Sequence, residues 1–219
     1  MKPTQFAIRI AAILAMPFIC AAAHAGSISV TVLDSGARPL ADAVVYVEPE
    51  PGQVVPKQLR STEIEQKGRK FSPLVTVVQT GTAILFPNND TVRHHIYSFS
   101  PAKVFEQKLY SGVPEKPITF DKPGTVVLGC NIHDQMLAYI LVVDTPYFAK
   151  TDASGKAKIE VPVSGKLRLK AWHFGLPAAD VPEQPVVFKN GEAVASFKLN
   201  AKAAAATSDS KPSSYKSDY

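Results

Sequence analysis

Residues 124–143 read GTVVLGCNIHDQMLAYILVV, a stretch in which two apolar runs flank a short polar loop. The runs are rich in valine, isoleucine and leucine, and a run of this length and composition is typical of a buried strand. The loop between them carries Cys130, His133 and Met136 at three-residue steps. The stretch therefore predicts two strands joined by a tight loop that holds a thiol, an imidazole and a thioether close together.

The first 25 residues are typical of a cleaved secretory signal peptide. Lys2 and Arg9 supply the positive charge, and an apolar stretch without acidic residues follows. Ala23-His24-Ala25 gives the small-x-small cleavage pattern before Gly26. Pro17 interrupts the apolar stretch, which is short for a bilayer core of about 30 Å. We therefore expect export to the periplasm and no stable insertion in the membrane.

Export changes the cysteine count. The chain has 2 cysteines, and Cys20 would leave with the signal peptide. Cys130 alone cannot form an internal disulfide in an oxidising compartment, so it must be inert, reactive, paired between chains or bound to a metal. The neighbouring His133 and Met136 favour a metal.

The charge of the chain gives little information about partners. The formal net charge is +5, and loss of Lys2 and Arg9 with the signal peptide lowers it to about +3. A charge this small and dispersed does not predict binding to nucleic acid. No set of acid, base and nucleophile is evident either, so we do not expect an enzyme.

From residue 26 onward the sequence is typical of an all-β protein. Short runs rich in valine, isoleucine, threonine and aromatic residues alternate with glycine, proline, asparagine and aspartate, and no run has convincing helical periodicity. This pattern predicts antiparallel sandwiches or barrels. The expected strands are 27–32, 43–48, 74–78, 82–86, 95–99, 116–120, 124–128, 139–143, 147–151, 156–161 and 166–173. Residues 60–70 are expected to form a loop or a short strand pair, and a hairpin is expected within 186–199. Residues 200–219 are expected to form a disordered tail.

Soft sulfur donors together with imidazole are the ligands of a mononuclear copper electron-transfer site, which takes two histidines, one cysteine and a weakly bound methionine. The loop supplies three of these four groups. The second histidine could be His94 or His95, which follow an asparagine-rich turn in which Asn89 is expected to order the loop. A c-type haem site would need a second cysteine, and a structural zinc site would need two cysteines or closed Cys/His pairs.

These residues resemble those of cupredoxins. In that family an asparagine-rich turn leads to a His-Asn pair, whose first member binds copper, so the resemblance implies His94 as the ligand and leaves His95 as the alternative. The spacing of Cys130, His133 and Met136 resembles the short loop of amicyanin. The resemblance implies one type 1 copper per chain, bound by His94, Cys130, His133 and Met136 in a Greek-key β-sandwich over residues 68–144.

The flanking segments resemble a different kind of domain. Residues 26–48 are similar to the opening hairpin of carboxypeptidase-regulatory or transthyretin-like β domains, and residues 145–199 are similar to the remainder. Either one small sandwich is split by the copper domain, which we favour, or both ends extend a single larger sandwich. The whole arrangement resembles exported proteins labelled methylamine utilization proteins, which have a plastocyanin-like centre. His173 lies in this part, and we expect it to pack beside Trp172 rather than to bind a metal.

The functional expectation is a monomeric periplasmic type 1 copper protein that carries single electrons between a donor and an acceptor protein. Such a carrier needs a modest apolar docking patch, expected here around His133, with Ile132 and Leu137 nearby. Two alternatives stay open: a copper chaperone or storage protein, and an envelope interaction module with a structural or vestigial metal site.

Overall fold

The computed structural model describes residues 25–48, 50–162, 166–177 and 180–201. All but the last residue of the expected signal peptide and nearly all of the expected tail lie outside these residues. Within them the regular structure consists of 17 β-strands. No helix in the described part of the chain is long and apolar enough to cross a membrane. The prediction of an all-β fold is confirmed.

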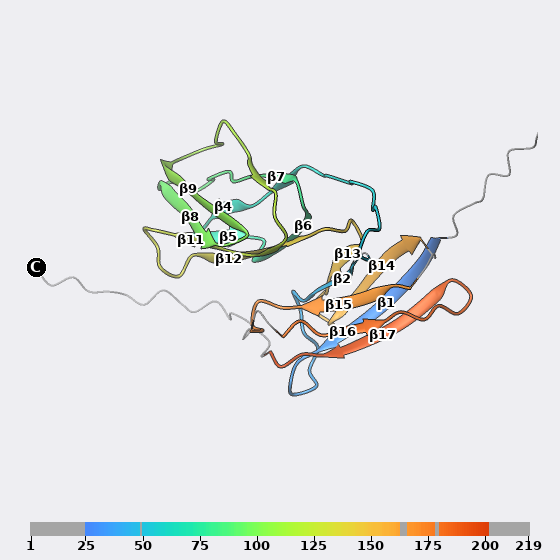
Figure 1. Ribbon diagram of the computed structural model, residues 1–219. Coiled ribbons are helices and arrows are strands. Elements are labelled where there is room, and N and C mark those ends of the chain that lie inside the picture. The colour runs from blue at the N-terminus through green and yellow to red at the C-terminus, as the bar shows by residue number, and fades with distance from the viewer. Residues whose placement is uncertain (1–24, 49, 163–165, 178–179, 202–219) are drawn as a thin grey trace, which may run out of the picture.

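The middle of the chain forms one unit, a sandwich of two facing sheets (Figure 1). The larger sheet has the strand order β6-β12-β11-β8-β9, the smaller sheet has the order β10-β7-β3, and β4 pairs with β5 in a hairpin. The strands are β3 (Thr62–Glu63), β4 (Glu65–Lys67), β5 (Lys70–Ser72), β6 (Val75–Gln79), β7 (Thr82–Leu85), β8 (His94–Ser100), β9 (Lys103–Tyr110), β10 (Ile118–Phe120), β11 (Gly124–Cys130) and β12 (Leu137–Val143).

Side-chain alternation along the larger sheet separates a core face from an outer face. On β11 the buried side chains of Val126, Leu128 and Cys130 point between the sheets, and on β12 those of Ala138, Ile140 and Val142 do the same. They pack with Phe86 and Phe120 from the other side of the core. Cys130 is therefore the last inward residue of a core strand.

One strand of this sheet was not predicted from the sequence. β9 alternates exposed and partly buried residues, with charged residues among the exposed ones, because it lies at the edge of the sheet and pairs only with β8. Its inward residue Phe105 packs against Phe86 and Phe120. An edge strand with one solvated face lacks the continuous apolar run that identifies the central strands.

The two ends of the chain form the second unit, which has two sheets of its own. Their strand orders are β14-β1-β17 and β13-β2-β15-β16. The strands are β1 (Ala25–Leu33), β2 (Val44–Glu48), β13 (Phe148–Lys150), β14 (Lys156–Pro162), β15 (Arg168–Trp172), β16 (Glu183–Pro185) and β17 (Glu192–Lys198). Their core includes Ile28, Val30, Val45, Leu169 and Phe197. The first two strands of the chain thus pair with strands from Phe148 onward.

The expected hairpin within residues 186–199 is only partly correct. A tight turn does form, since Lys189 and Glu192 exchange backbone hydrogen bonds around Asn190 and Gly191, which both have positive φ. The strand after the turn, however, pairs in parallel with β1. Burial of Phe197 in the core of the second unit favours this pairing over a local hairpin.

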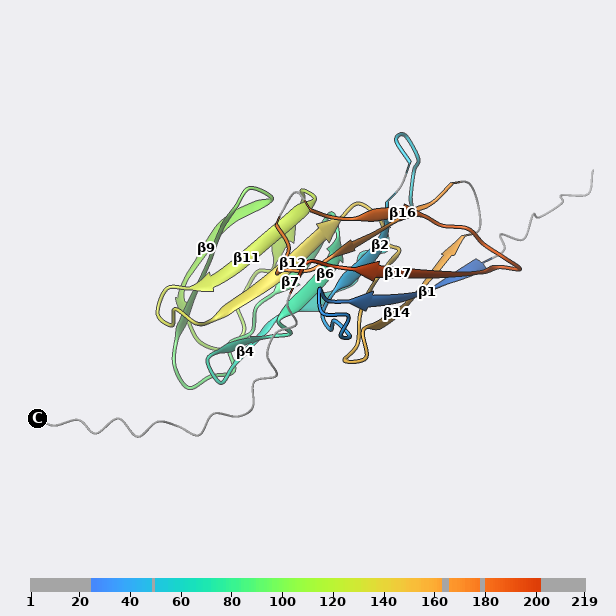
Figure 2. The same cartoon turned by 90° about the horizontal axis from the view of Figure 1, so that it is seen from below.

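A third apolar cluster joins the two units. Trp172 and Val44 of the second unit pack against Val75, Leu141 and Val143 on the outer face of the larger sheet. Beside them Phe174 stacks on Tyr139 with 4.7 Å between ring centroids. The second unit therefore covers the outer face over β6 and β12, and Figure 2 shows the two units side by side in this arrangement.

We expect Trp172→Ala to lower the free energy of unfolding by about 3–5 kcal/mol, because it leaves a cavity between the two units where the indole is 4% exposed. Val194→Ala, at a side chain that is 88% exposed, should change stability by less than about 0.5 kcal/mol. Urea unfolding of both variants checks the prediction. Equal effects would show that the joint between the units contributes nothing.

Candidate metal centre

The loop after β11 is held tightly against the larger sheet. The Asn131 amide donates to the His95 carbonyl at 3.0 Å, and the Met136 amide donates to the His133 carbonyl at 2.9 Å. The first bond ties the loop to β8, and the second closes a turn within the loop. The side chains of Cys130, His133 and Met136 are thus positioned by backbone hydrogen bonds.

Three of the predicted ligand groups converge. The Cys130 sulfur lies 3.6 Å from His94 Nδ1 and 3.9 Å from His133 Nδ1. The donor atoms of the three residues all lie within 4.8 Å of one another, and the two imidazole rings are 5.1 Å apart between centroids. The structure therefore brings Cys130 together with His94, which is 36 positions away in the sequence, and with His133, which is 3 positions away.

The group lies at the end of the sandwich core, with one side near the surface. His94 and Cys130 are buried, and Met136 is buried in the same apolar cluster as Cys130. His133 is half-buried, and the neighbouring Ile132 is 48% exposed. Bulk water is excluded from three of the four side chains, whereas the fourth provides an edge toward solvent.

The adjacent histidines of β8 point to opposite faces of the sheet, as consecutive residues of a strand do. His94 points inward to Cys130. His95 points outward, and its Nε2 pairs with the Glu106 carboxylate at 2.8 Å. The geometry thus brings His94, and not His95, to the cysteine.

A carboxylate that the sequence analysis did not identify orients His94. Asp90 Oδ2 lies 2.7 Å from His94 Nε2, and the carboxylate also accepts hydrogen bonds from the amides of Gly68 at 2.6 Å and Arg69 at 2.9 Å. Both amides belong to the turn between β4 and β5. The sequence signal was an acidic residue four positions before the histidine, at the end of the asparagine-rich turn.

The charge state of Asp90 decides which nitrogen of His94 is free. Burial alone would raise the pKa of Asp90, but the amide of Arg69, the imidazole of His94 and the amide of Gly68 together hold that pKa below its ordinary value. An ionised carboxylate can only accept, so His94 Nε2 carries the proton. The other ring nitrogen, Nδ1, faces Cys130, and in metal sites a carboxylate fixes the orientation of a histidine in this way.

Asn88, rather than Asn89, orders the turn before β8. Its side-chain amide donates to the carbonyls of Val92 at 3.0 Å and Tyr110 at 2.8 Å, while its oxygen accepts from the Asp90 amide at 3.0 Å. Asn89 instead donates to Glu65 at an exposed position. The expectation for Asn89 was therefore wrong by one residue, because Asn88 is the buried residue of the turn and its backbone pairs with Gly112, just after β9.

His173 lies in the second unit, apart from the cysteine. Its Nδ1 accepts from the Gly175 amide at 3.0 Å, and its ring lies 4.1 Å from that of Phe174. Burial lowers the pKa of His173, although Asp42 and a backbone contact with Ala41 oppose the shift. These contacts are those of a packed histidine, whose aromatic neighbour is Phe174.

The two-sheet sandwich, with one histidine on β8 and a Cys-x-x-His-x-x-Met loop at the end of β11, has the arrangement that the resemblance to cupredoxins implies. The predicted architecture, a β-sandwich in the middle of the chain with a further β region, is confirmed.

No family model matches the chain, and no curated protein sequence matches it. Among solved structures, a purple cupredoxin from Nitrosopumilus maritimus is 22% identical over 37% of this chain and 98% of that chain, with a TM-score of 0.34. An amicyanin from Paracoccus versutus is 15% identical over 40% of this chain and 84% of that chain, with a TM-score of 0.32. A copper-containing nitrite reductase from Thermus scotoductus is 24% identical over 51% of this chain and 28% of that chain, with a TM-score of 0.36. Values of this size do not place the chain in one family.

Removal of the Asp90 carboxylate should destabilise the metal-free protein. Asp90→Ala leaves His94 Nε2 and two turn amides without their acceptor, which should cost about 1–3 kcal/mol in the free energy of unfolding. Glu65→Ala, which removes only the exposed partner of Asn89, serves as the matched control and should change it by less than about 0.5 kcal/mol. Urea unfolding in the presence of a chelator measures both, and a control as unstable as Asp90→Ala would contradict the assignment.

Proposed function

We propose that this chain is an exported mononuclear type 1 copper protein that carries single electrons between periplasmic redox partners. The observation that supports this function best is the convergence of His94 Nδ1, Cys130 Sγ and His133 Nδ1 beside the buried Met136.

The spacing of the donor atoms fits one bound ion. Metal–nitrogen and metal–sulfur bonds of about 2.0–2.3 Å in a near-trigonal plane place neighbouring donor atoms roughly 3.7 Å apart. In the structure the two imidazole nitrogens lie 3.6 and 3.9 Å from the cysteine sulfur. A thiolate, two imidazoles and a thioether suit copper better than the hard cations, which prefer oxygen.

Each residue has a separate task in the proposed site. Copper bound there would supply one-electron chemistry. Cys130 provides the soft thiolate, and His94 is held in one orientation by Asp90 and the β4–β5 turn. Met136 closes the core side against water. Because the loop is tied by hydrogen bonds to β8 and within itself, its donors can keep one arrangement in both oxidation states.

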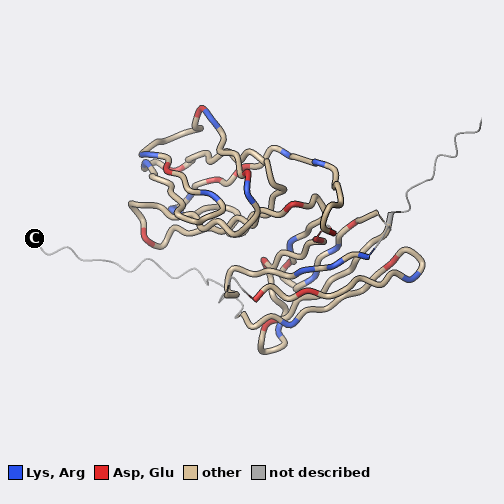
Figure 3. The backbone as a smooth tube through the Cα atoms, in the orientation of Figure 1, with Lys and Arg blue, Asp and Glu red and all other residues tan. Residues whose placement is uncertain are grey.

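A carrier agrees with the donor set better than an enzyme does. All four proposed ligands come from the protein, whereas a catalytic metal site keeps an open position for water or substrate. Acidic and basic residues are interspersed over both units (Figure 3), which supports protein partners rather than nucleic acid. We further propose that the protein is a monomer, that it lies in the periplasm, and that it exchanges electrons with a donor and an acceptor protein.

The visible spectrum tests this function. Purified protein loaded with Cu(II) should show an intense thiolate-to-copper absorption band, because the cysteine sulfur is the strongest donor. Cys130→Ser should lose the band completely. A colourless protein that binds only Cu(I) would identify a storage or chaperone protein instead, and a protein that binds no copper would refute both.

The two histidines of β8 provide a matched pair of variants. His94→Ala should abolish the band and weaken copper binding more than about 100-fold, since it removes a donor rather than a supporting group. His95→Ala should keep the intensity of the band and the copper affinity within about twofold of the wild-type values, because His95 contacts Glu106 on the other face of the sheet. Copper titration against a competing chelator measures both, and the reverse order would make His95 the ligand.

A further inference from the structure

The outer face of the larger sheet is only half covered. Over β6 and β12 the second unit packs on it, whereas over β11, β8 and β9 the same face is open. Phe99 is 79% exposed there and Val104 is 66% exposed. We call this open part the lateral face, and it consists of Tyr97, Phe99, Val104, Val127 and Leu137.

Strand register makes the lateral face continuous. Val127 is the cross-strand partner of Tyr139, and Phe99 is the cross-strand partner of Val104. The Val127 amide donates to the Ser100 hydroxyl at 2.9 Å, which brings β11 and β8 together at this level. Since Tyr139 also belongs to the cluster between the units, the open row continues an apolar surface that is already used for packing.

The lateral face is in direct contact with the residue before Cys130. Gly129 pairs with Tyr97, and a Cβ atom at position 129 would lie 2.7 Å from Tyr97 Cζ and 2.8 Å from its hydroxyl oxygen. The tyrosine ring therefore lies across the glycine, and its centroid is 5.1 Å from that of Phe99. An unbroken path of contacts thus runs from Cys130 through Gly129 and Tyr97 to the exposed Phe99.

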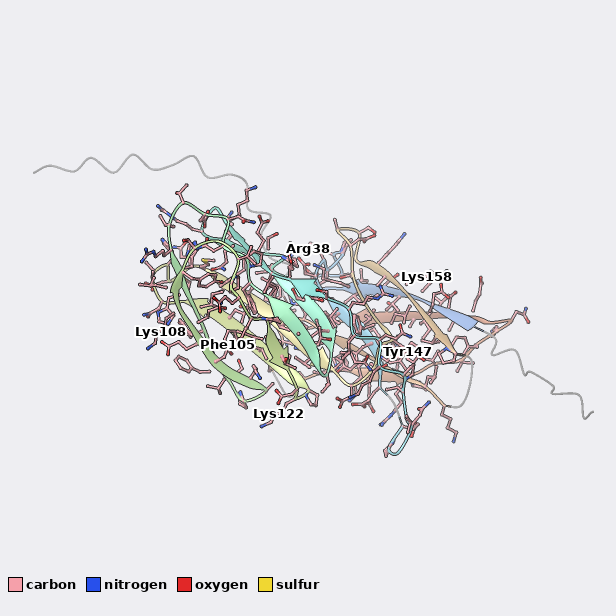
Figure 4. The ribbon with its side chains drawn as sticks, turned by 90° about the horizontal axis from the view of Figure 1, so that it is seen from above. Arg38, Phe105, Lys108, Lys122, Tyr147 and Lys158 are labelled. Atoms are coloured by element: carbon pink, nitrogen blue, oxygen red, sulfur yellow. The ribbon has the colours of Figure 1, made fainter. Side chains whose placement is uncertain are left out.

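The charged groups nearest to the lateral face are paired. Glu106 pairs with His95 at 2.8 Å, and Lys103 pairs with Asp121 at 3.2 Å. Lys108, further along β9, lies at the outer margin of the sandwich (Figure 4). Glu106 is the cross-strand partner of Tyr97 on this face, so a carboxylate that contacts His95 borders the apolar side chains.

We propose that the lateral face is the docking surface for a one-electron redox protein whose contact surface is mainly apolar. This inference rests on the proposed function. With copper bound, one electron would pass between the partner and the site by way of Tyr97, Gly129 and the Cys130 sulfur, and the partner would be oxidised as the site is reduced. Five side chains are far fewer than the about 20–30 residues per side of a stable interface, which favours a short-lived complex over a permanent dimer.

The docking surface differs from the one expected around His133. Leu137 was expected beside that histidine. It pairs instead with Gly129, is 43% exposed and belongs to the lateral face. Of the two apolar residues expected beside His133, Ile132 is the one that stays exposed on the loop after β11. The two surfaces can therefore be varied independently.

A methyl-terminated alkanethiol monolayer on gold serves as the probe, because it is an apolar, uncharged contact surface. Copper-loaded full-length protein is adsorbed, its mass is measured with a quartz microbalance, and its electron exchange is measured by voltammetry. The double variant Phe99→Ser/Val104→Ser should reduce the adsorbed mass and the rate of electron exchange at least tenfold, with an unchanged visible band. The matched control Val187→Ser/Val194→Ser, which removes two exposed valines of the second unit, should change neither by more than twofold.

Two variants of Tyr97 distinguish the electron route from adsorption of the protein. Tyr97→Leu should retain most of the adsorbed mass but slow electron exchange several-fold, whereas Tyr97→Phe keeps the ring and should retain the rate. Equal rates in the two variants would overturn the route through Tyr97.

Three results would overturn the docking proposal. The first is that Ile132→Ser, rather than the double variant, abolishes adsorption, which assigns docking to the loop end. The second is that neither change affects it. The third is a stable dimer in sedimentation equilibrium that the double variant dissociates, which assigns the lateral face to a second copy. Wild-type protein without a visible band would instead overturn the proposed function, while its adsorbed mass would still decide whether the face docks.

Discussion

The pairing of β8 with the end of β11 is the constraint on which the candidate metal centre depends. Cys130 is opposite Ile96 across these strands, so the inward residues at the start of β8 face the cysteine sulfur. The loop that follows is then bonded back to β8 through the His95 carbonyl. A shift of this register by one residue would turn His94 outward and His95 inward, and the donor group would be lost.

A second constraint reaches the site from a hairpin that is distant in sequence. The turn between β4 and β5 directs two amides at Asp90, and Asp90 in turn orients His94. The asparagine-rich turn that carries Asp90 is fixed by Asn88, whose amide bonds to the carbonyl of Tyr110 on β9. The histidine is therefore positioned by three elements of the sandwich in addition to its own strand.

The larger sheet has different tasks on its two faces. Its inner face provides the core and the donor group, and its outer face is divided between the joint with the second unit and the lateral face. The glycine before the cysteine connects the two, since only a residue without a side chain lets Tyr97 lie against the strand at that level. Packing, the proposed metal binding and the proposed docking thus depend on one alternation of side chains.

Local pattern by itself determined the all-β class, most of the central strands and the loop with Cys130, His133 and Met136, because strand alternation and ligand spacing are properties of short segments. Tertiary structure decided the rest. It selected His94 over His95 through the facing of β8, supplied Asp90 through a hairpin more than 20 residues away, and added β9, whose edge position weakens its apolar pattern. It also placed β17 beside β1 and Tyr97 on Gly129. These contacts join segments that are distant along the chain, and such contacts form only when the sheets assemble.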